Sequence, residues 1–291
     1  MIVGAVDIGT NSMRLLITDG TTEIGRWVEV TGLGRGVDRT GALSPEGIED
    51  SLVALARFGA TMEEKGVEQR MAIATSAARD ASNRELFFDL AESALAVRPR
   101  LVSGEEEARL AYAGAISGAQ VEGPVVVSDI GGGSTELVTR EGAVSIDIGS
   151  VRLTERAIPT RPPPPSEMAR ARSLVADRFR DIRLETGTLI GVAGTWTSLA
   201  AIAQDLPEYS MDMVHGHRMK RSELRAVIDS LAGKTVEETA AIPSLDPKRA
   251  PVILAGALVA DGVMGALVVG EVMVSEHDTL DGVAMELLAL P

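Results

Sequence analysis

The stretch Val6-Asp7-Ile8-Gly9-Thr10-Asn11-Ser12-Met13-Arg14-Leu15 decides how this chain is interpreted, because it occurs twice. It recurs as Ser128-Asp129-Ile130-Gly131-Gly132-Gly133-Ser134-Thr135-Glu136-Leu137, and the Asp, Ile, first Gly, Ser and Leu match at one offset without a gap. A short glycine motif found once is weak evidence. Two copies in one chain predict two similar structural units.

The surroundings of the motif repeat as well. Each copy begins with a β-branched apolar run, at Ile2–Val6 and Val125–Val127, which predicts a buried strand. Each then predicts two more strands joined by glycine-containing turns, followed by alternating helices and strands. The pattern predicts an α/β fold with two tandem domains, 1–123 and 124–291, divided at Gly123-Pro124.

Capping residues and prolines locate several further elements. Ser44-Pro45 predicts a helix start that ends before Gly66, and further helices are expected over Asn83–Leu95 and from Gly104. The run Pro162–Pro165 predicts a stiff connection. The apolar stretch Val252–Val269 contains Asp261 and several glycines, so a buried strand and helix are expected there rather than a membrane span.

Composition excludes some classes of function. The 291 residues carry a formal net charge of −14, which disfavours binding to nucleic acid. The absence of cysteine excludes disulfides and thiolate metal sites. The N-terminus lacks the basic and apolar segments of a signal peptide, so we expect a cytoplasmic protein with no membrane association.

The repeated glycine loops predict anion binding. Glycine allows backbone N–H groups to approach a phosphate closely, and hydroxyl groups add further donors. The candidate phosphate contacts are Gly9, Thr10, Asn11 and Ser12 in the first loop and Gly131, Gly132, Gly133 and Ser134 in the second. Either loop alone is equally compatible with a plain hairpin turn, but an aspartate retained in both copies is not needed to turn the chain. That aspartate, Asp7 or Asp129, is expected to hold Mg²⁺ or a metal-bound water.

A third glycine-containing loop, with Gly194 and Thr195, is another candidate phosphate site, although small residues there also suit tight helix–strand packing. Arg14 and Arg79 are candidates for contacts to phosphate oxygens, and for Arg14 a surface role is an equal alternative. In Glu105-Glu106-Glu107, one carboxylate is expected to orient or deprotonate water, while the others complement the helix dipole. The three histidines show no metal-ligand spacing.

These motifs together resemble the exopolyphosphatase/guanosine pentaphosphate phosphohydrolase family of the actin-like ATPase and sugar-kinase fold. The resemblance covers nearly the whole chain. It rests on the two glycine loops and on Gly34-Arg35-Gly36-Val37-Asp38, Thr40-Gly41-Ala42-Leu43-Ser44, Ala74-Thr75-Ser76-Ala77-Ala78-Arg79 with Asn83, Ser103-Gly104-Glu105-Glu106-Glu107-Ala108-Arg109 and Gly191-Val192-Ala193-Gly194-Thr195.

The resemblance implies two actin-like (ribonuclease H-like) domains with a central cleft. It selects Glu107 as the catalytic base, Asp129 and Glu136 as the metal-coordinating pair, Asp7 as the matching acid and Arg79 as the substrate-phosphate arginine. The implied reaction is release of orthophosphate from chain ends by water with Mg²⁺, or alternatively Mn²⁺. A homodimer is also implied.

The chain departs from the family pattern in places. It stops at Pro291, without the C-terminal helical domains of longer relatives, so short polyphosphate is the expected substrate. Thr279-Leu280-Asp281-Gly282 stands where the family commonly has Leu-Arg-Glu-Gly, and Pro251 stands where the family often has Asp. Neither change affects the expected catalytic set.

Other functions are compatible with the same chemistry or fold. Guanosine pentaphosphate hydrolysis would need a base-binding pocket, and aromatic residues make up only 3% of the chain. An ATPase, a kinase, an assembly protein or a non-catalytic polyphosphate-binding protein would share the fold. Neither the kinase nor the assembly hypothesis explains the Ser103–Arg109 motif, and every catalytic residue that the resemblance implies is present, which disfavours a non-catalytic binding protein.

Overall fold

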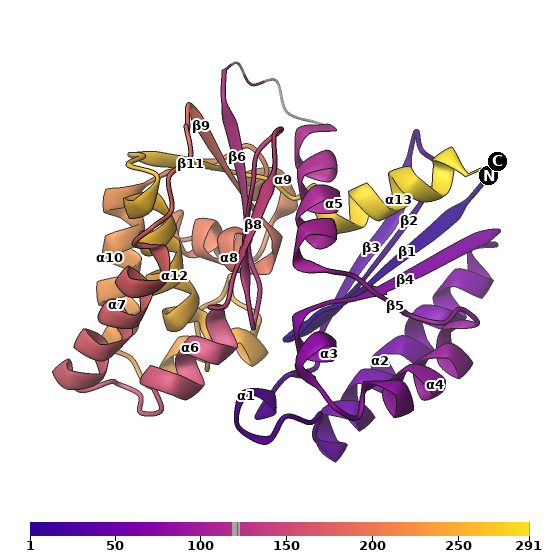
Figure 1. Ribbon diagram of the computed structural model, residues 1–291, viewed down its shortest axis with the longest axis horizontal. Helices are drawn as coiled ribbons and strands as arrows, with labels where there is room; N and C mark the ends of the chain where they lie inside the picture. Colours follow the sequence, from indigo (N-terminus) through magenta and orange to yellow (C-terminus); the bar gives the residue numbers. More distant parts are fainter. Residues whose placement is uncertain (118–120, 122, 291) are drawn as a thin grey trace. The chain divides into compact units, whose positions relative to one another are not determined.

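The computed structural model consists of two compact units. One comprises Met1–Ser117 with Asp278–Pro291, and the other comprises Gly118–His277. The structure describes residues 1–117, 121 and 123–290. Each unit contains one mixed sheet with helices packed on it (Figure 1).

The first unit is built around an antiparallel meander. β1 (Val3–Ile8), β2 (Ser12–Thr18) and β3 (Glu23–Val30) are consecutive neighbours, and the sheet order is β3-β2-β1-β4-β5. β4 (Gln69–Ala74) lies parallel to β1, and β5 (Arg100–Leu101) lies parallel to β4. Because β1 and β4 are parallel, their C-terminal ends, at Ile8 and Ala74, lie next to each other at the same side of the sheet.

Helices cover both faces of this sheet. α2 (Pro45–Glu64) and α4 (Arg84–Leu95) pack on the face that carries Val6, Ile8 and Met13. α5 (Gly104–Ser117) and α13 (Thr279–Ala289) pack on the face that carries Val3 and Ala5. Because side chains alternate along a strand, Asp7 and Arg14 belong to this second face. The short helices α1 (Val37–Thr40) and α3 (Ser76–Asp80) complete the unit.

The second unit repeats the meander and extends it. β6 (Val125–Ile130), β7 (Thr135–Val138) and β8 (Ala143–Ile146) form the meander, and β9 (Thr188–Val192) lies parallel to β6. β11 (Glu271–Val274) and β10 (Arg218–Lys220) follow, giving the order β10-β11-β9-β6-β7-β8. The helices are α6 (Ser150–Ala157), α7 (Pro165–Phe179), α8 (Ala193–Ala203), α9 (Met211–Val214), α10 (Arg221–Ala232), α11 (Val236–Ala240) and α12 (Ile253–Ala266), with a 3₁₀ turn at Pro247–Arg249.

The two meanders turn in the same way. Gly9 N donates to Ser12 O at 3.0 Å, and Gly131 N donates to Ser134 O at 3.0 Å. The predicted α/β class and the predicted repetition of the meander are therefore confirmed. The helix predicted from Ser44-Pro45 is also confirmed, because Ser44 accepts a hydrogen bond from Gly47 N at the start of α2.

The last helix lies in the first unit, whereas the sequence placed it in a second domain of 124–291. Leu280, Val283, Ala284 and Leu287 of α13 are buried with Leu110 of α5 and with the sheet. Their apolar spacing predicts a helix, but it contains nothing that selects which sheet the helix covers. Hydrophobic burial on the exposed face of the first sheet decides its position.

Two other segments differ from the expectation. Val252–Val269 contains one helix, α12, and no strand. Pro165 is the first residue of α7, where its missing N–H leaves no hydrogen bond unmade. None of the helices in the described part of the chain combines the length and apolar character that a bilayer crossing requires.

α5 and α13 approach so closely that glycine is required at their crossing. A Cβ added at Gly282 would lie 2.1 Å from Leu110 O, and one added at Gly114 would lie 1.9 Å from Asp278 O.

We predict that Gly282→Ala lowers the free energy of unfolding by about 1–3 kcal/mol, outweighing a helix-propensity gain of up to about 1 kcal/mol. Urea unfolding checks this. Gly270→Ala, which would meet no atom within 4 Å, is the control, and equal stability of both variants would contradict the close crossing.

Candidate functional site

The first glycine loop is held rigidly inside the first unit. Gly34 N donates to Thr10 O at 2.8 Å, and Thr31 N and Gly32 N each donate to Asn11 O at 3.0 Å. Thr10 Oγ1 accepts a hydrogen bond from Ala77 N of α3 at 3.2 Å. The loop that connects β1 to β2 is therefore fixed against α3, which also carries Arg79.

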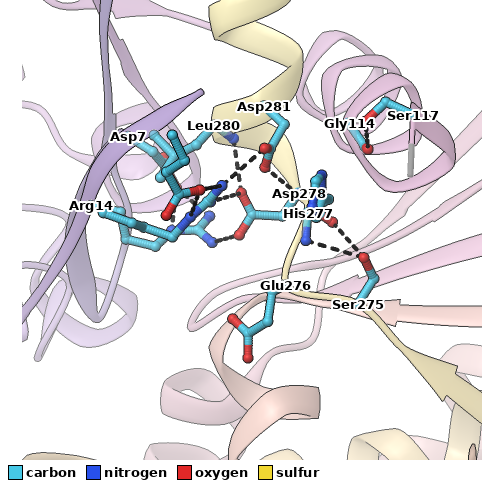
Figure 2. A network of polar contacts seen from close by, with 12 residues as sticks. Asp7, Arg14, Gly114, Ser117, Ser275, Glu276, His277, Asp278, Leu280 and Asp281 are labelled. Atoms are coloured by element: carbon cyan, nitrogen blue, oxygen red, sulfur yellow. Dashed lines mark hydrogen bonds and ion pairs between the residues drawn. The ribbon is translucent and has the colours of Figure 1, made fainter. Parts of the chain in front are cut away.

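A buried ion network lies behind this loop (Figure 2). Arg14 donates to Asp7 Oδ2 through Nη2 at 2.5 Å and through Nε at 3.1 Å, and its Nη1 contacts Asp278 Oδ2. Asp278 caps α13 by accepting from Leu280 N at 2.9 Å. Burial raises the pKa of Asp7, although the Arg14 guanidinium acts in the opposite direction.

This network bears on two predicted site residues. Arg14 is only 9% exposed, and its guanidinium is already engaged by two carboxylates, so the geometry favours a structural role over a phosphate contact. Asp7 uses Oδ2 for Arg14, while its buried Oδ1 has no hydrogen-bond partner among the described residues. Oδ1 of Asp7 is thus available to bind a metal ion or a water molecule. The positive charge of the neighbouring Arg14 would disfavour a metal ion there.

Arg79 and Glu107 form the second polar group of the first unit. Arg79 Nη1 donates to Glu107 Oε2 at 2.8 Å and to Val102 O at 2.9 Å. No group in the described parts of the chain bonds to Nε or Nη2 of Arg79, and its side chain is 22% exposed. The guanidinium therefore keeps one edge that can contact a phosphate in a bidentate manner.

The structure separates the three acidic residues at the start of α5. Glu105 is exposed, Glu106 is half-buried and paired with Arg100, and Glu107 is buried and paired with Arg79. The helix begins with Ser103 Oγ accepting from Glu106 N at 3.1 Å. The residues alone left the choice among the three open. Burial and the Arg79 contact single out Glu107.

The second glycine loop is bonded to the start of α6. Gly131 O and Gly132 O accept hydrogen bonds from the start of α6, at distances of 2.9–3.0 Å from Ser150, Val151 and Arg152 N. A Cβ at Gly149 would lie 2.5 Å from Gly132 O, so only glycine fits there. Ser134, the predicted hydroxyl donor, is buried beside these turns.

Asp129 and Glu136 lie directly opposite each other on β6 and β7. Both are buried, and Glu136 Oε1 accepts a hydrogen bond from Ser145 Oγ at 2.8 Å. Directly opposite residues share one face of a sheet with Cβ atoms about 4.5–5.5 Å apart, where like charges destabilise each other. Two buried carboxylates in this arrangement fit a divalent cation, which prefers oxygen ligands.

The third loop opens α8. Thr195 Oγ1 donates to Ile130 O at 2.7 Å, which ties this loop to the end of β6. A Cβ added at Gly194 would lie 2.2 Å from Nη1 of Arg249, so the arginine rests directly on the glycine. Sequence reasoning did not select Arg249, because it lies 55 residues from Gly194 and its spacing carries no motif.

The predicted site residues therefore form two sets. The first unit brings together Asp7, Arg14 and the first loop, and separately Arg79 with Glu107. The second unit brings together Asp129, Glu136, the second loop, Gly194 and Thr195. Within residues 1–117, 121 and 123–290, no cluster of three or more His, Asp or Glu side chains is arranged to hold a metal ion. Asp129 and Glu136 are thus a pair of donors, and other ligands would come from water or substrate.

Known proteins are similar to this chain in sequence and in fold. A model described as the Ppx/GppA phosphatase family matches residues 17–290. A Mycobacterium tuberculosis protein named exopolyphosphatase 2 is 39% identical over 312 residues, covering 98% of each chain. A crystal structure of an exopolyphosphatase-like protein has 35% identity and a TM-score of 0.95 over 99% of this chain and 98% of the other. The Aquifex aeolicus Ppx/GppA family member has 30% identity and a TM-score of 0.82 over 99% and 97%.

The buried ion network generates a prediction about stability. Arg14→Met leaves Asp7 and Asp278 buried without their shared cation, and we expect it to lower the free energy of unfolding by about 3–5 kcal/mol. Arg57 forms an ion pair with Glu29 at the surface, and the Arg57 side chain is 65% exposed. Arg57→Met removes this pair and should change the free energy of unfolding by at most about 1 kcal/mol. Chemical denaturation compares the two. A small effect of Arg14→Met would contradict the structural role.

Proposed function

The chain belongs to the Ppx/GppA phosphatase family, and we propose that it is an exopolyphosphatase. The reaction is hydrolysis of the terminal phosphoanhydride bond of inorganic polyphosphate, with short chains as the preferred substrate. Relatives named exopolyphosphatase support this assignment, among them the M. tuberculosis protein that aligns with 98% of the chain.

The Arg79–Glu107 contact is the observation that carries the proposal. Glu107 is the one buried carboxylate of the acidic run, and Arg79 fixes its orientation from α3. In the proposed mechanism Glu107 accepts a proton from the water that attacks the terminal phosphorus, while the remaining edge of Arg79 binds the phosphate oxygens. The arginine thereby positions the base and the phosphate against each other.

Asp129 and Glu136 are the proposed metal ligands, with Asp7 as a further candidate through its Oδ1 atom. Mg²⁺ is the proposed ion and Mn²⁺ the alternative. When bound, the ion would offset negative charge that develops on the phosphate oxygens. The pairing of two buried carboxylates across β6 and β7 supports this site, because a cation relieves their repulsion.

Residues of the three loops are proposed to surround the phosphate chain, with donors other than the N–H groups of Gly9 and Gly131, which already close the two turns. They are Gly9, Thr10, Asn11, Ser12, Gly131, Gly132, Gly133, Ser134, Gly194 and Thr195. Arg249, which rests on Gly194, joins this set on the strength of its position. A chain with a net charge of −14 needs such local donors to hold a polyanion.

Guanosine pentaphosphate is the second candidate substrate. Tyr209 is 41% exposed, and its hydroxyl donates to Glu276 Oε1 at 2.5 Å, in the electrostatic reach of Arg249. An exposed aromatic ring near a phosphate-binding arginine is the feature that a nucleobase would need. Activity towards this substrate that falls selectively in Tyr209→Ala would support it.

Three further expectations remain proposals. The chain would act in the cytoplasm, and 1–123 and 124–291 would be its N-terminal and C-terminal actin-like domains. It would also form a homodimer. Val53, Leu86 and Leu90, exposed on α2 and α4, are apolar surface of the first unit that such a contact would use.

We predict that Glu107→Gln folds normally and loses turnover on tripolyphosphate by a factor of about 10²–10⁴, the usual contribution of a general base. Glutamine keeps the size of the side chain and an oxygen that can accept from Arg79, while it removes the base together with the negative charge of the ion pair. Phosphate release measures the effect. Glu106→Gln, from the preceding position of the same helix, should keep near-normal turnover, and a fully active Glu107→Gln would refute the assignment.

The metal site gives a separate prediction. Asp129→Asn should raise the Mg²⁺ concentration needed for half-maximal activity by about tenfold or more, because one carboxylate ligand becomes neutral. Calorimetric titration with Mg²⁺ supplies a readout that does not depend on turnover. Asp7→Asn is the comparison, and an unchanged Mg²⁺ requirement in Asp129→Asn would exclude the proposed pair.

A further inference from the structure

The second unit contains a groove that the catalytic proposal does not use. It lies along α12 between α7 and α10, and its volume of about 550 Å³ lies within the size range of small-molecule sites. Its floor is apolar, with Val175, Phe179 and Leu258 among its residues. Val175 packs directly against Gly262 in this floor, because a Cβ there would lie 2.2 Å from Val175 Cγ1.

The rim of this groove is strongly basic although the chain is acidic. Arg172, Arg180, Arg183 and Arg221 line it against a single carboxylate, that of Asp261. In the part of the chain that the structure describes, Arg172 has no ion pair, and Arg183 bonds only to the backbone carbonyls of Arg180 and Ile182. In a protein with a net charge of −14, this local excess of positive charge selects an anion.

One arginine of the rim is fixed in place. Arg221 Nε donates to Asp261 Oδ1 at 2.7 Å, and its Nη2 donates to Asp261 O at 3.0 Å. The guanidinium lies over Gly265, where a Cβ would be 2.7 Å from Nη2. A preorganised guanidinium loses little side-chain entropy when it binds an anion.

Val268 at the edge of the groove is a separate observation. It follows the last turn of α12 with a φ of 56°, in the left-handed region where a β-branched residue is strained and where glycine is favoured. Its side chain is 88% exposed, so packing within the protein does not offset the strain. A strained, exposed apolar side chain suggests contact with something outside the chain.

We propose that this groove binds a soluble amphiphilic anion, namely an unbranched acyl or alkyl chain that carries a terminal phosphate or carboxylate. The apolar floor and Val268 contact the chain, while Arg172, Arg183 and Arg221 bind the head group. The apolar floor is unnecessary for inorganic polyphosphate, and the arginines are unnecessary for an uncharged hydrocarbon. None of the proposed catalytic or phosphate-loop residues lines this groove, so the proposal is independent of the hydrolase assignment.

Calorimetric titration with decyl phosphate and with decanoate, below their micellar concentrations, tests the proposal. We expect saturable binding that weakens about tenfold or more in Arg172→Glu/Arg183→Glu. Ala176→Trp, at an exposed position of α7 that lines the groove, should block binding by filling the space. Arg178→Glu changes the charge of the same helix outside the groove and should leave affinity unchanged. So should Arg79→Met, which removes the phosphate arginine of the proposed catalytic site.

Val268→Gly distinguishes a ligand contact by Val268 from a purely structural role of this residue. Removing the strain should raise the thermal unfolding midpoint, while loss of the apolar contact should weaken decyl phosphate binding several-fold. The proposal is overturned if decyl phosphate does not bind, or if decanol or tripolyphosphate binds this groove equally well. Binding only to anionic vesicles would overturn it too, since that would indicate a membrane surface instead of a soluble ligand.

Discussion

Each sheet places an aspartate opposite the residue seven positions later in the chain. This pairing sets the charge beside the first turn of each meander. The turn with its glycine N–H to serine C=O bond fixes the register in both units. In the first unit the opposite residue is Arg14, which neutralises Asp7. In the second it is Glu136, which adds to the charge of Asp129. One backbone geometry therefore gives a closed ion pair in one unit and two facing carboxylates, the proposed metal ligands, in the other.

The closed pair has a structural consequence beyond the turn. Arg14 and Arg26 both reach Asp278, the residue that caps the last helix, and Arg26 also contacts Asp281 at 2.9 Å. Burial alone would lower the pKa of Arg26, but the carboxylates of Asp278 and Asp281 outweigh it and raise that pKa. Charges on β2 and β3 thus fix the start of α13, and its apolar residues then complete the core beneath the sheet.

Much of the fold could be predicted because its signals are local. The repeat located both meanders, and Ser44, Asn83 and Gly104 located the starts of three helices. The choice among Glu105, Glu106 and Glu107 needed the family resemblance, since burial and the contact with Arg79 depend on residues far apart in sequence. The position of Arg249 over Gly194 and the groove along α12 also depend on contacts between residues far apart in sequence, so local patterns did not predict them. The exchange of arginine for glutamate between the repeats was visible in the sequence, but its meaning required knowing that these residues face each other.

The return of the chain to its first unit constrains how the protein can form during synthesis. Residues 1–117 lack one helix of the layer that α5 begins until Asp278 and α13 have been made, whereas residues 118–277 are continuous. On a ribosome that synthesises from the N-terminus, the later unit has all its own residues before the earlier one does. Until then Arg14 lacks its contact with Asp278, and Val3 and Ala5 lack the apolar side chains of α13. A chain that ends before Asp278 would lack α13 and would leave part of one face of the first sheet uncovered.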